Sequence, residues 1–284
     1  MKKKKIILLV LGIVLVTLSI LIFTNINNRS SAPDFSQYYR GNYTEAYKKL
    51  LPAAQKGDAI AQVSLGNLYS AGLGVKQNYK KAYFWYKKAE SQNNIDAMIN
   101  LAVMYKNGYY VKKNIDIAIN LYEKVINLNN DSNALFNLST IYLYDKKDNK
   151  VGLKLLEESS KLGNSTAQSQ LGLIYYLGEY NLPINYQQAI TLLKKSATAG
   201  NSSGQNNLAV AYYQGKAIKK NDFKAYFWFY IASNFGNNSK SKELINAYSF
   251  NLTDSQKQQA VNKAEKWVKN HKEINSSLMT ANTK

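Results

Sequence analysis

The chain has 284 residues, a formal net charge of +19, no cysteine and a single histidine, His271. Without cysteine, disulfides, thiol nucleophiles and cysteine-ligated metals are excluded, and one histidine lacks the partners that a histidine-based metal site needs. We therefore expect no metal and no cofactor. The 45% hydrophobic content is sufficient for a sizeable core.

The N-terminus combines a basic start with a long apolar run. Residues 1–5 are Met and four lysines, and residues 6–23 carry no charge. As a helix this run would extend roughly 27 Å, close to the thickness of a bilayer hydrocarbon core. It also exceeds the apolar stretch of a typical cleavable signal peptide. We therefore predict a transmembrane signal-anchor at 6–23, with a cleaved signal peptide and a soluble periplasmic protein as the alternative.

The charge distribution around this run predicts its orientation. Four lysines precede it, whereas a lone Arg29 follows it closely. Positive charge is retained on the cytoplasmic side, so residues 1–5 form a cytoplasmic tail in this prediction. The rest of the chain then lies on the periplasmic or extracellular side of a bacterial inner membrane.

The segment after the anchor is predicted to be a linker followed by one isolated helix. Residues 24–41 are polar and contain Pro33, as is typical of a tether. Residues 43–55 are predicted to form a helix that begins at Asn42 and covers the N-terminal end of the domain. Pro52 is expected to end or kink this helix early.

Residues 42–236 repeat one pattern of two short helices joined by a turn that usually contains glycine. In the first copy, Ala61, Leu65 and Tyr69 share a face of the first helix, and Trp85 lies on the apolar face of the second. An Asn or Asp N-cap recurs every 34–37 residues, a period that indicates stacked helical hairpins. These caps are Asn42, Asn78, Asn114, Asp148, Asn185 and Asn221. Left-handed helix terminators are expected at Gly57, Asn93, Asn129, Gly163, Gly200 and Gly236.

The motif residues of the first copy resemble the Sel-1-like repeat family, a relative of the tetratricopeptide repeat. The matching positions include Leu65, Gly66, Tyr69, Gly72, Gly74, Ala82, Trp85 and Tyr86. The resemblance implies an all-α solenoid, a right-handed superhelix of about five helix-turn-helix repeats. The five pairs are expected at 58–93, 94–129, 130–163, 164–200 and 201–236. The third departs most, because Asp145 stands where the turn glycine should be and the loop is short.

One polar row is the candidate binding site. By the same resemblance, the first helix of each repeat lines a concave face that binds other proteins. A polar residue precedes the repeat leucine in every copy, and two further asparagines flank the row. The candidates are Ser64, Asn67, Asn100, Asn137, Gln170, Asn206 and Asn207. Amides both donate and accept, so such a row could bind an extended peptide or a carboxylate. The other interpretation is a helix flank that water covers in an asparagine-rich chain.

The C-terminal part is predicted to close the array. Residues 237–270 should form capping helices that cover the last hairpin. Thr253 and Gln256 have the spacing of a capping box, and Ala260, Ala264 and Trp267 continue an amphipathic pattern. Residues 271–284 are predicted to be a disordered tail.

The sequence lacks the patterns of an enzyme. Its one acidic pair, Glu157 and Glu158, is adjacent on a helix, so the two carboxylates point about 100° apart. We expect no catalysis, no small-molecule substrate and no nucleic-acid partner. The leading hypothesis is a membrane-anchored protein–protein interaction scaffold of the bacterial envelope. The alternatives are a basic binder of an anionic envelope polymer or of lipid headgroups, and an immunity-type inhibitor of an envelope toxin.

Overall fold

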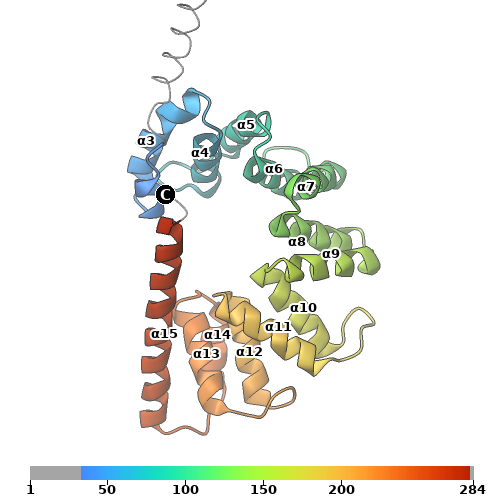
Figure 1. The fold of residues 1–284 in the computed structure, drawn as a ribbon, viewed down its shortest axis with the longest axis vertical. Coiled ribbons are helices and arrows are strands. Elements are labelled where there is room, and N and C mark those ends of the chain that lie inside the picture. The colour runs from blue at the N-terminus through green and yellow to red at the C-terminus, as the bar shows by residue number, and fades with distance from the viewer. Residues whose placement is uncertain (1–32, 282–284) are drawn as a thin grey trace, which may run out of the picture. The chain divides into compact units, whose positions relative to one another are not determined.

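The computed structural model describes residues 33–281, with side chains described through residue 271 (Figure 1). Every regular element in this range is helical, which confirms the predicted all-α repeat fold. The chain divides after Asn114 into two compact units. The predicted transmembrane segment 6–23 lies outside the described residues, and no helix within them is long and apolar enough to cross a bilayer.

The first unit is a short stack of helices in chain order (Figure 1). Its elements are α2 (Ser36–Tyr39), α3 (Tyr43–Gln55), α4 (Ala59–Ala71), α5 (Tyr79–Glu90) and α6 (Ile95–Asn107). Helix α4 packs against α3 and α5, and α5 also packs against α6. Small residues such as Ala61 and Ala82 are fully buried, which lets the backbones approach, and Leu50, Leu65 and Tyr86 fill the core.

The second unit continues the alternation of short helices. Its elements are α7 (Ile115–Asn129), α8 (Ser132–Thr140), η1 (Ile141–Asp145), α9 (Asn149–Lys161), α10 (Ser165–Leu177), α11 (Tyr186–Thr198), α12 (Ser202–Gln214), α13 (Asp222–Asn234), α14 (Ser239–Ala247) and α15 (Asp254–Ala281). Leu156, Leu193 and Phe229 are fully buried between successive helices. Helix α13 packs against both α14 and α15, so these two cover the last repeat.

Asparagine and aspartate caps fix where the helices begin. At Asn78, Asp148, Asn185 and Asn221 the side chain accepts from the N–H three residues on, as the sequence predicts. Asn42 does not cap α3, because its amide donates instead to Gln37 Oε1 at 2.8 Å. A second series of caps, which the sequence analysis missed, begins the first helix of each pair. These caps are Asp58, Asn94, Asp131, Asn164 and Asn201.

The predicted linker and the predicted effect of proline need correction. Residues 34–41 are not a free tether, because α2 lies there and Lys49 pairs with Asp34 at 2.7 Å. Helix α3 passes Pro52 and ends at Gln55. The proline removes only its own N–H, and its carbonyl still accepts from the N–H of Lys56 at 3.1 Å.

The third repeat departs from the others where the sequence indicated. Its first helix is short and continues as the π-helical turn η1, which ends at Asp145. Lys147 then adopts a φ of 56°, a left-handed conformation that favours glycine. Two helix terminators also lie one residue later than predicted, at Asn130 and Asn237 instead of Asn129 and Gly236.

The C-terminal capping box forms as predicted, whereas the tail prediction is wrong over most of its length. The N–H of Thr253 donates to Gln256 Oε1 at 2.9 Å, and the N–H of Gln256 donates to Thr253 Oγ1 at 3.2 Å. Helix α15 then continues to Ala281, well into the predicted disordered tail 271–284. No glycine or proline interrupts residues 254–281, so the helix has no stop signal there.

Candidate partner-binding grooves

In the first unit the candidate row is tied into the repeat's own hydrogen bonds. Asn67 Oδ1 accepts from the hydroxyl of Tyr86 at 2.8 Å and from the amide of Asn100 at 3.1 Å. Ser64 is only 7% exposed. The prediction that Ser64 lies on a binding surface is therefore wrong, because its side chain is buried. Asn67 links α4, α5 and α6, so its oxygen is used within the stack and not offered to a partner.

In the second unit the candidates have different surroundings. Asn206 is 4% exposed and accepts from the hydroxyl of Ser241 at 2.8 Å, so its placement on the surface is corrected too. Gln170 is half-buried and donates to Tyr144 Oη at 2.7 Å. Asn137 is half-buried, and its amide has no hydrogen-bond partner among the described residues. Burial and pairing therefore leave Asn137 and Asn207 as the most available members of the row.

Asn207 lines a cavity of about 320 Å³ that we call the α10–α12 groove. Its walls come from α10, α11 and α12 and are largely apolar, with amides and a phenol at intervals. The lining residues are Leu173, Tyr176, Leu177, Ile184, Tyr186, Leu193, Asn207, Val210, Gln214 and Lys216. Asn207 donates to Ser169 Oγ at 3.4 Å and accepts from Asn206 at 3.3 Å. Both distances are beyond the usual range, so these bonds hold the Asn207 amide weakly.

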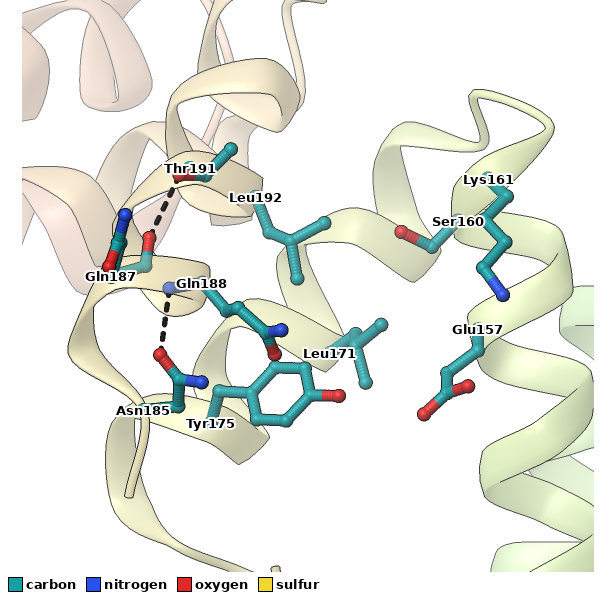
Figure 2. A pocket seen from close by; sticks show the side chains of 10 residues that line it. All are labelled: Glu157, Ser160, Lys161, Leu171, Tyr175, Asn185, Gln187, Gln188, Thr191 and Leu192. Atoms are coloured by element: carbon teal, nitrogen blue, oxygen red, sulfur yellow. Dashed lines mark hydrogen bonds between the residues drawn. The ribbon is translucent and has the colours of Figure 1, made fainter. Parts of the chain in front are cut away.

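A second and larger cavity, of about 660 Å³, lies between α9, α10 and α11, and we call it the α9–α11 groove. Figure 2 shows Glu157 and Lys161 projecting from α9 on one side and Gln187, Gln188 and Thr191 on α11 on the other. Leu171 and Tyr175 of α10 lie between them, and the Tyr175 hydroxyl points toward Glu157. No pattern in the sequence predicted this groove.

The titratable side chains of the α9–α11 groove are Glu157, Lys161 and Tyr175. Burial raises the pKa of Tyr175, and the nearby Glu157 carboxylate acts in the same direction. Tyr175 therefore stays a neutral phenol at physiological pH. Glu157 is the single carboxylate of the lining, and His271 is far along the chain in α15, where it stacks on Trp267 at 3.6 Å between ring centroids. Among the described residues there is no cluster of metal-ligating side chains.

The repeat periodicity corresponds to a known family. Five stretches of the chain match the Sel1 repeat, and together they cover more than half of it. They are residues 59–94, 95–130, 132–164, 165–201 and 202–237. The chain belongs to the Sel1 repeat family. Each matched stretch begins within two residues of a predicted helical pair.

Solved bacterial structures share the fold of this Sel1 repeat protein. A Sel1 repeat protein from Oxalobacter formigenes is 28% identical with a TM-score of 0.65, over 81% of this chain and 97% of that one. A protective antigen of uropathogenic Escherichia coli strains is 30% identical with a TM-score of 0.65 over 82% of this chain. This chain spans about half of that antigen (51%).

A more distant structure has the same fold at lower identity. It is an immunity protein from Pseudomonas aeruginosa, 22% identical with a TM-score of 0.53, over 70% of this chain and 76% of that one. At this identity the likeness concerns the fold alone. No curated protein matches the chain.

The family assignment separates packing residues from the rest. Leu65, Ala82 and Trp85 occupy repeat positions and are buried, so the repeat itself explains them. The α10–α12 groove instead uses residues on the same helix face as Asn207. Val210 and Gln214 follow Asn207 by three and seven residues, so the helical periodicity of α12 places all three on one face. This spacing is the signal in the sequence that could have identified the groove.

Proposed function

We propose that this Sel1 repeat protein is a non-enzymatic, membrane-anchored scaffold of the bacterial envelope that binds a protein partner in the α10–α12 groove. The observation that carries the proposal is the position of Asn207. Its amide lies in the lining of an apolar groove and is held by two long hydrogen bonds of 3.3 and 3.4 Å. An amide in this setting can exchange those bonds for bonds to a ligand at low cost.

The lining indicates what the partner presents. Leu173, Leu177 and Val210 supply apolar contact, and Asn207 and Gln214 supply paired donors and acceptors. An extended peptide segment has both features, because its backbone needs donors and acceptors while its side chains are buried. The Tyr176 hydroxyl already donates to Gln214 Oε1 at 2.7 Å, which orients the side chain, and the Gln214 N–H₂ has no hydrogen-bond partner among the described residues.

The anchor in this proposal is the uncharged run at residues 6–23, and the basic residues before it set the orientation. Carbonate extraction of membranes, together with mass spectrometry of the N-terminus, tests this part. Retention in the membrane with an intact N-terminus supports the anchor. A soluble protein that begins near residue 30 contradicts it.

The groove is tested by photo-crosslinking in intact cells. A benzoyl-phenylalanine at position 210 should capture a specific protein partner, and Asn207→Ala should reduce that capture without unfolding the repeats. The matched control is Gln187→Ala, an exposed amide in the α9–α11 groove. If Gln187→Ala abolishes capture and Asn207→Ala does not, the α10–α12 groove is the wrong site.

The identity of the captured protein decides the role of the scaffold. Capture of an envelope enzyme or toxin whose activity falls on binding would make the chain an inhibitor of the immunity type. The 22% identity to an immunity protein supports the fold alone, so it gives this role no preference. Capture of an envelope protein whose activity is unchanged supports an assembly scaffold.

A further inference from the structure

The first unit carries an exposed group of aromatic rings and lysines on α5 and on the turn after α6. We define the aromatic–lysine surface as Lys80, Tyr83, Phe84, Lys87, Lys88 and Tyr110. These residues line an open groove of about 400 Å³ together with Ser91. Phe84 is 50% exposed and Tyr110 is 54% exposed, although large apolar groups are usually covered in a soluble domain.

The rings are held outward by contacts to their neighbours. Tyr83 packs against Tyr110 with ring centroids 5.6 Å apart, and Tyr83 Oη lies 3.1 Å from Tyr105 Oη. Lys88 Nζ lies 4.8 Å from the centroid of Phe84, so a cation covers the ring that is most exposed on α5. The surface is therefore an ordered arrangement of rings and not a set of loose side chains.

The backbone conformation at Tyr110 strengthens this interpretation. Its φ is 66°, and Gly74 occupies the same position of the first repeat with a φ of 67°. A tyrosine in the left-handed region costs conformational free energy that a glycine does not. The chain thus places an exposed ring where packing alone would favour glycine.

The charge of the surface selects its ligand. Among the side chains that line the groove, three are lysines and none is a carboxylate. Glu90 is close by and pairs with Lys87 at 2.6 Å, so we count only Lys80 and Lys88 toward an anionic ligand. Tyrosine and lysine beside an exposed apolar ring are the side chains found at the boundary between lipid headgroups and acyl chains.

The chain length before this unit favours a bilayer as the source of that chemistry. Nine residues, 24–32, separate the end of the apolar run at Phe23 from the first described residue. Nine extended residues reach at most about 30 Å. If residues 6–23 anchor the chain, as in the proposed function, the first unit cannot leave the neighbourhood of the headgroups.

We propose that the aromatic–lysine surface binds the anionic headgroup layer of the membrane that carries the anchor, with Phe84 and Tyr110 at the acyl boundary and Lys80 and Lys88 on lipid phosphates. This contact rests on the proposed anchor. It would hold the first unit against the bilayer by one face and so fix the orientation of that unit relative to the membrane.

The absence of cysteine makes the contact directly measurable. A single Phe84→Cys variant of the full chain is labelled with an environment-sensitive nitrobenzoxadiazole group and reconstituted in vesicles of phosphatidylcholine with phosphatidylglycerol. The matched control is Thr191→Cys, the exposed residue at the same repeat position of α11. We expect a blue-shifted emission and severalfold slower dithionite reduction of the label at position 84, and neither at position 191.

Two further comparisons separate the contribution of the lysine charges to the lipid contact from the contribution of the membrane anchor. Lys80→Gln and Lys88→Gln, each combined with Phe84→Cys, should lower the ratio of lipid-bound to water-exposed label by about fivefold at low salt. In vesicles of phosphatidylcholine alone, which carry no net charge, the ratio of lipid-bound to water-exposed label at position 84 should fall as well. Lys194→Gln and Lys195→Gln remove an equal charge from exposed sites of the second unit and should leave the ratio unchanged.

The outcomes are distinct. If the label at position 84 behaves like the label at 191 in anionic vesicles while carbonate leaves the chain in the membrane, the lipid contact is overturned and the anchor stands. If carbonate removes the chain, the anchor itself fails. Shielding at position 84 that depends on protein concentration and not on lipid charge indicates a second copy on this surface and also overturns the proposal.

Discussion

The hydroxyl of Tyr86 donates a 2.8 Å hydrogen bond to Asn67 Oδ1, which joins the two helices of the first repeat. The same oxygen accepts from Asn100 of the next repeat at 3.1 Å. Asn67 therefore acts as a connector within the stack. Its hydrogen bonds are shorter than those of Asn207, which is the reason we assign packing to the former and partner binding to the latter.

Asn67→Ala should destabilise the first unit without changing partner capture. It removes the acceptor of the Asn100 amide and the nearer acceptor of the buried Tyr86 phenol, which keeps Ser70 Oγ at 3.2 Å, so we expect a loss of about 1 kcal/mol. Chemical denaturation measures the loss. Asn137→Ala is the control, because it breaks no hydrogen bond to a described residue and should change stability by less than about 0.5 kcal/mol. A neutral Asn67→Ala variant would contradict the assignment.

Tyr122→Phe should stabilise the protein. Tyr122 is fully buried, and its hydroxyl has no hydrogen-bond partner among the described residues. Burial also raises the pKa of this phenol far above its usual range. Replacing an unpaired buried hydroxyl by hydrogen should raise the free energy of unfolding by about 1 kcal/mol. A decrease would mean that the hydroxyl has a partner, such as a buried water.

The fold followed from the sequence because the repeat uses short-range signals. Asn78 and Gly72 act on the backbone within a few residues, so their spacing in the sequence predicts their structure. The binding grooves did not follow so readily. Whether an amide is free depends on residues about twenty to forty positions away, as Asn67 depends on Tyr86 and Asn206 on Ser241. Only packing brings those pairs together.

The error in the predicted linker and the missed α9–α11 groove have a similar cause. Residues 34–41 are polar, as is typical of a linker, yet Lys49 is within 2.7 Å of Asp34 once α3 has formed. The α9–α11 groove was missed because its lining combines three helices, and Glu157 and Gln188 carry no shared spacing in the chain.

Stability should fall between about pH 10 and pH 12 with a contribution from Tyr86. Burial raises the pKa of Tyr86 to about 12 in the folded state, whereas an unfolded tyrosine titrates near its ordinary value of 10.0. A raised folded pKa means that the contribution is complete below pH 10 and is lost as the pH rises through 12. The slope for one such group is about 1.4 kcal/mol per pH unit in that window.

The measurement compares Tyr86→Phe with the unmodified chain by urea denaturation from pH 8 to pH 12. The variant should be less stable at pH 8, because Asn67 loses a donor, and the difference should shrink above pH 10. Tyr39→Phe, at a ring that is 74% exposed, should follow the unmodified chain. A constant difference between Tyr86→Phe and the unmodified chain would exclude a role for this phenol in alkaline unfolding.

Lys147→Gly should stabilise the third repeat. Lys147 has a φ of 56° two residues after the π-helical turn Ile141–Asp145, in the shortened loop that distinguishes this repeat. A side chain in the left-handed region costs roughly 1–2 kcal/mol relative to glycine. Part of this gain is offset because glycine is freer in the unfolded chain, so we expect a net increase of about 0.5–1 kcal/mol in the free energy of unfolding.

The control is Lys154→Gly, within helix α9, which should lower the free energy of unfolding by about 1 kcal/mol. Hydrogen exchange of the α9 amides should slow in the first variant and accelerate in the second. If both variants destabilise equally, the left-handed conformation at Lys147 is not the source of strain, and the departure of this repeat lies in the π-helical turn itself.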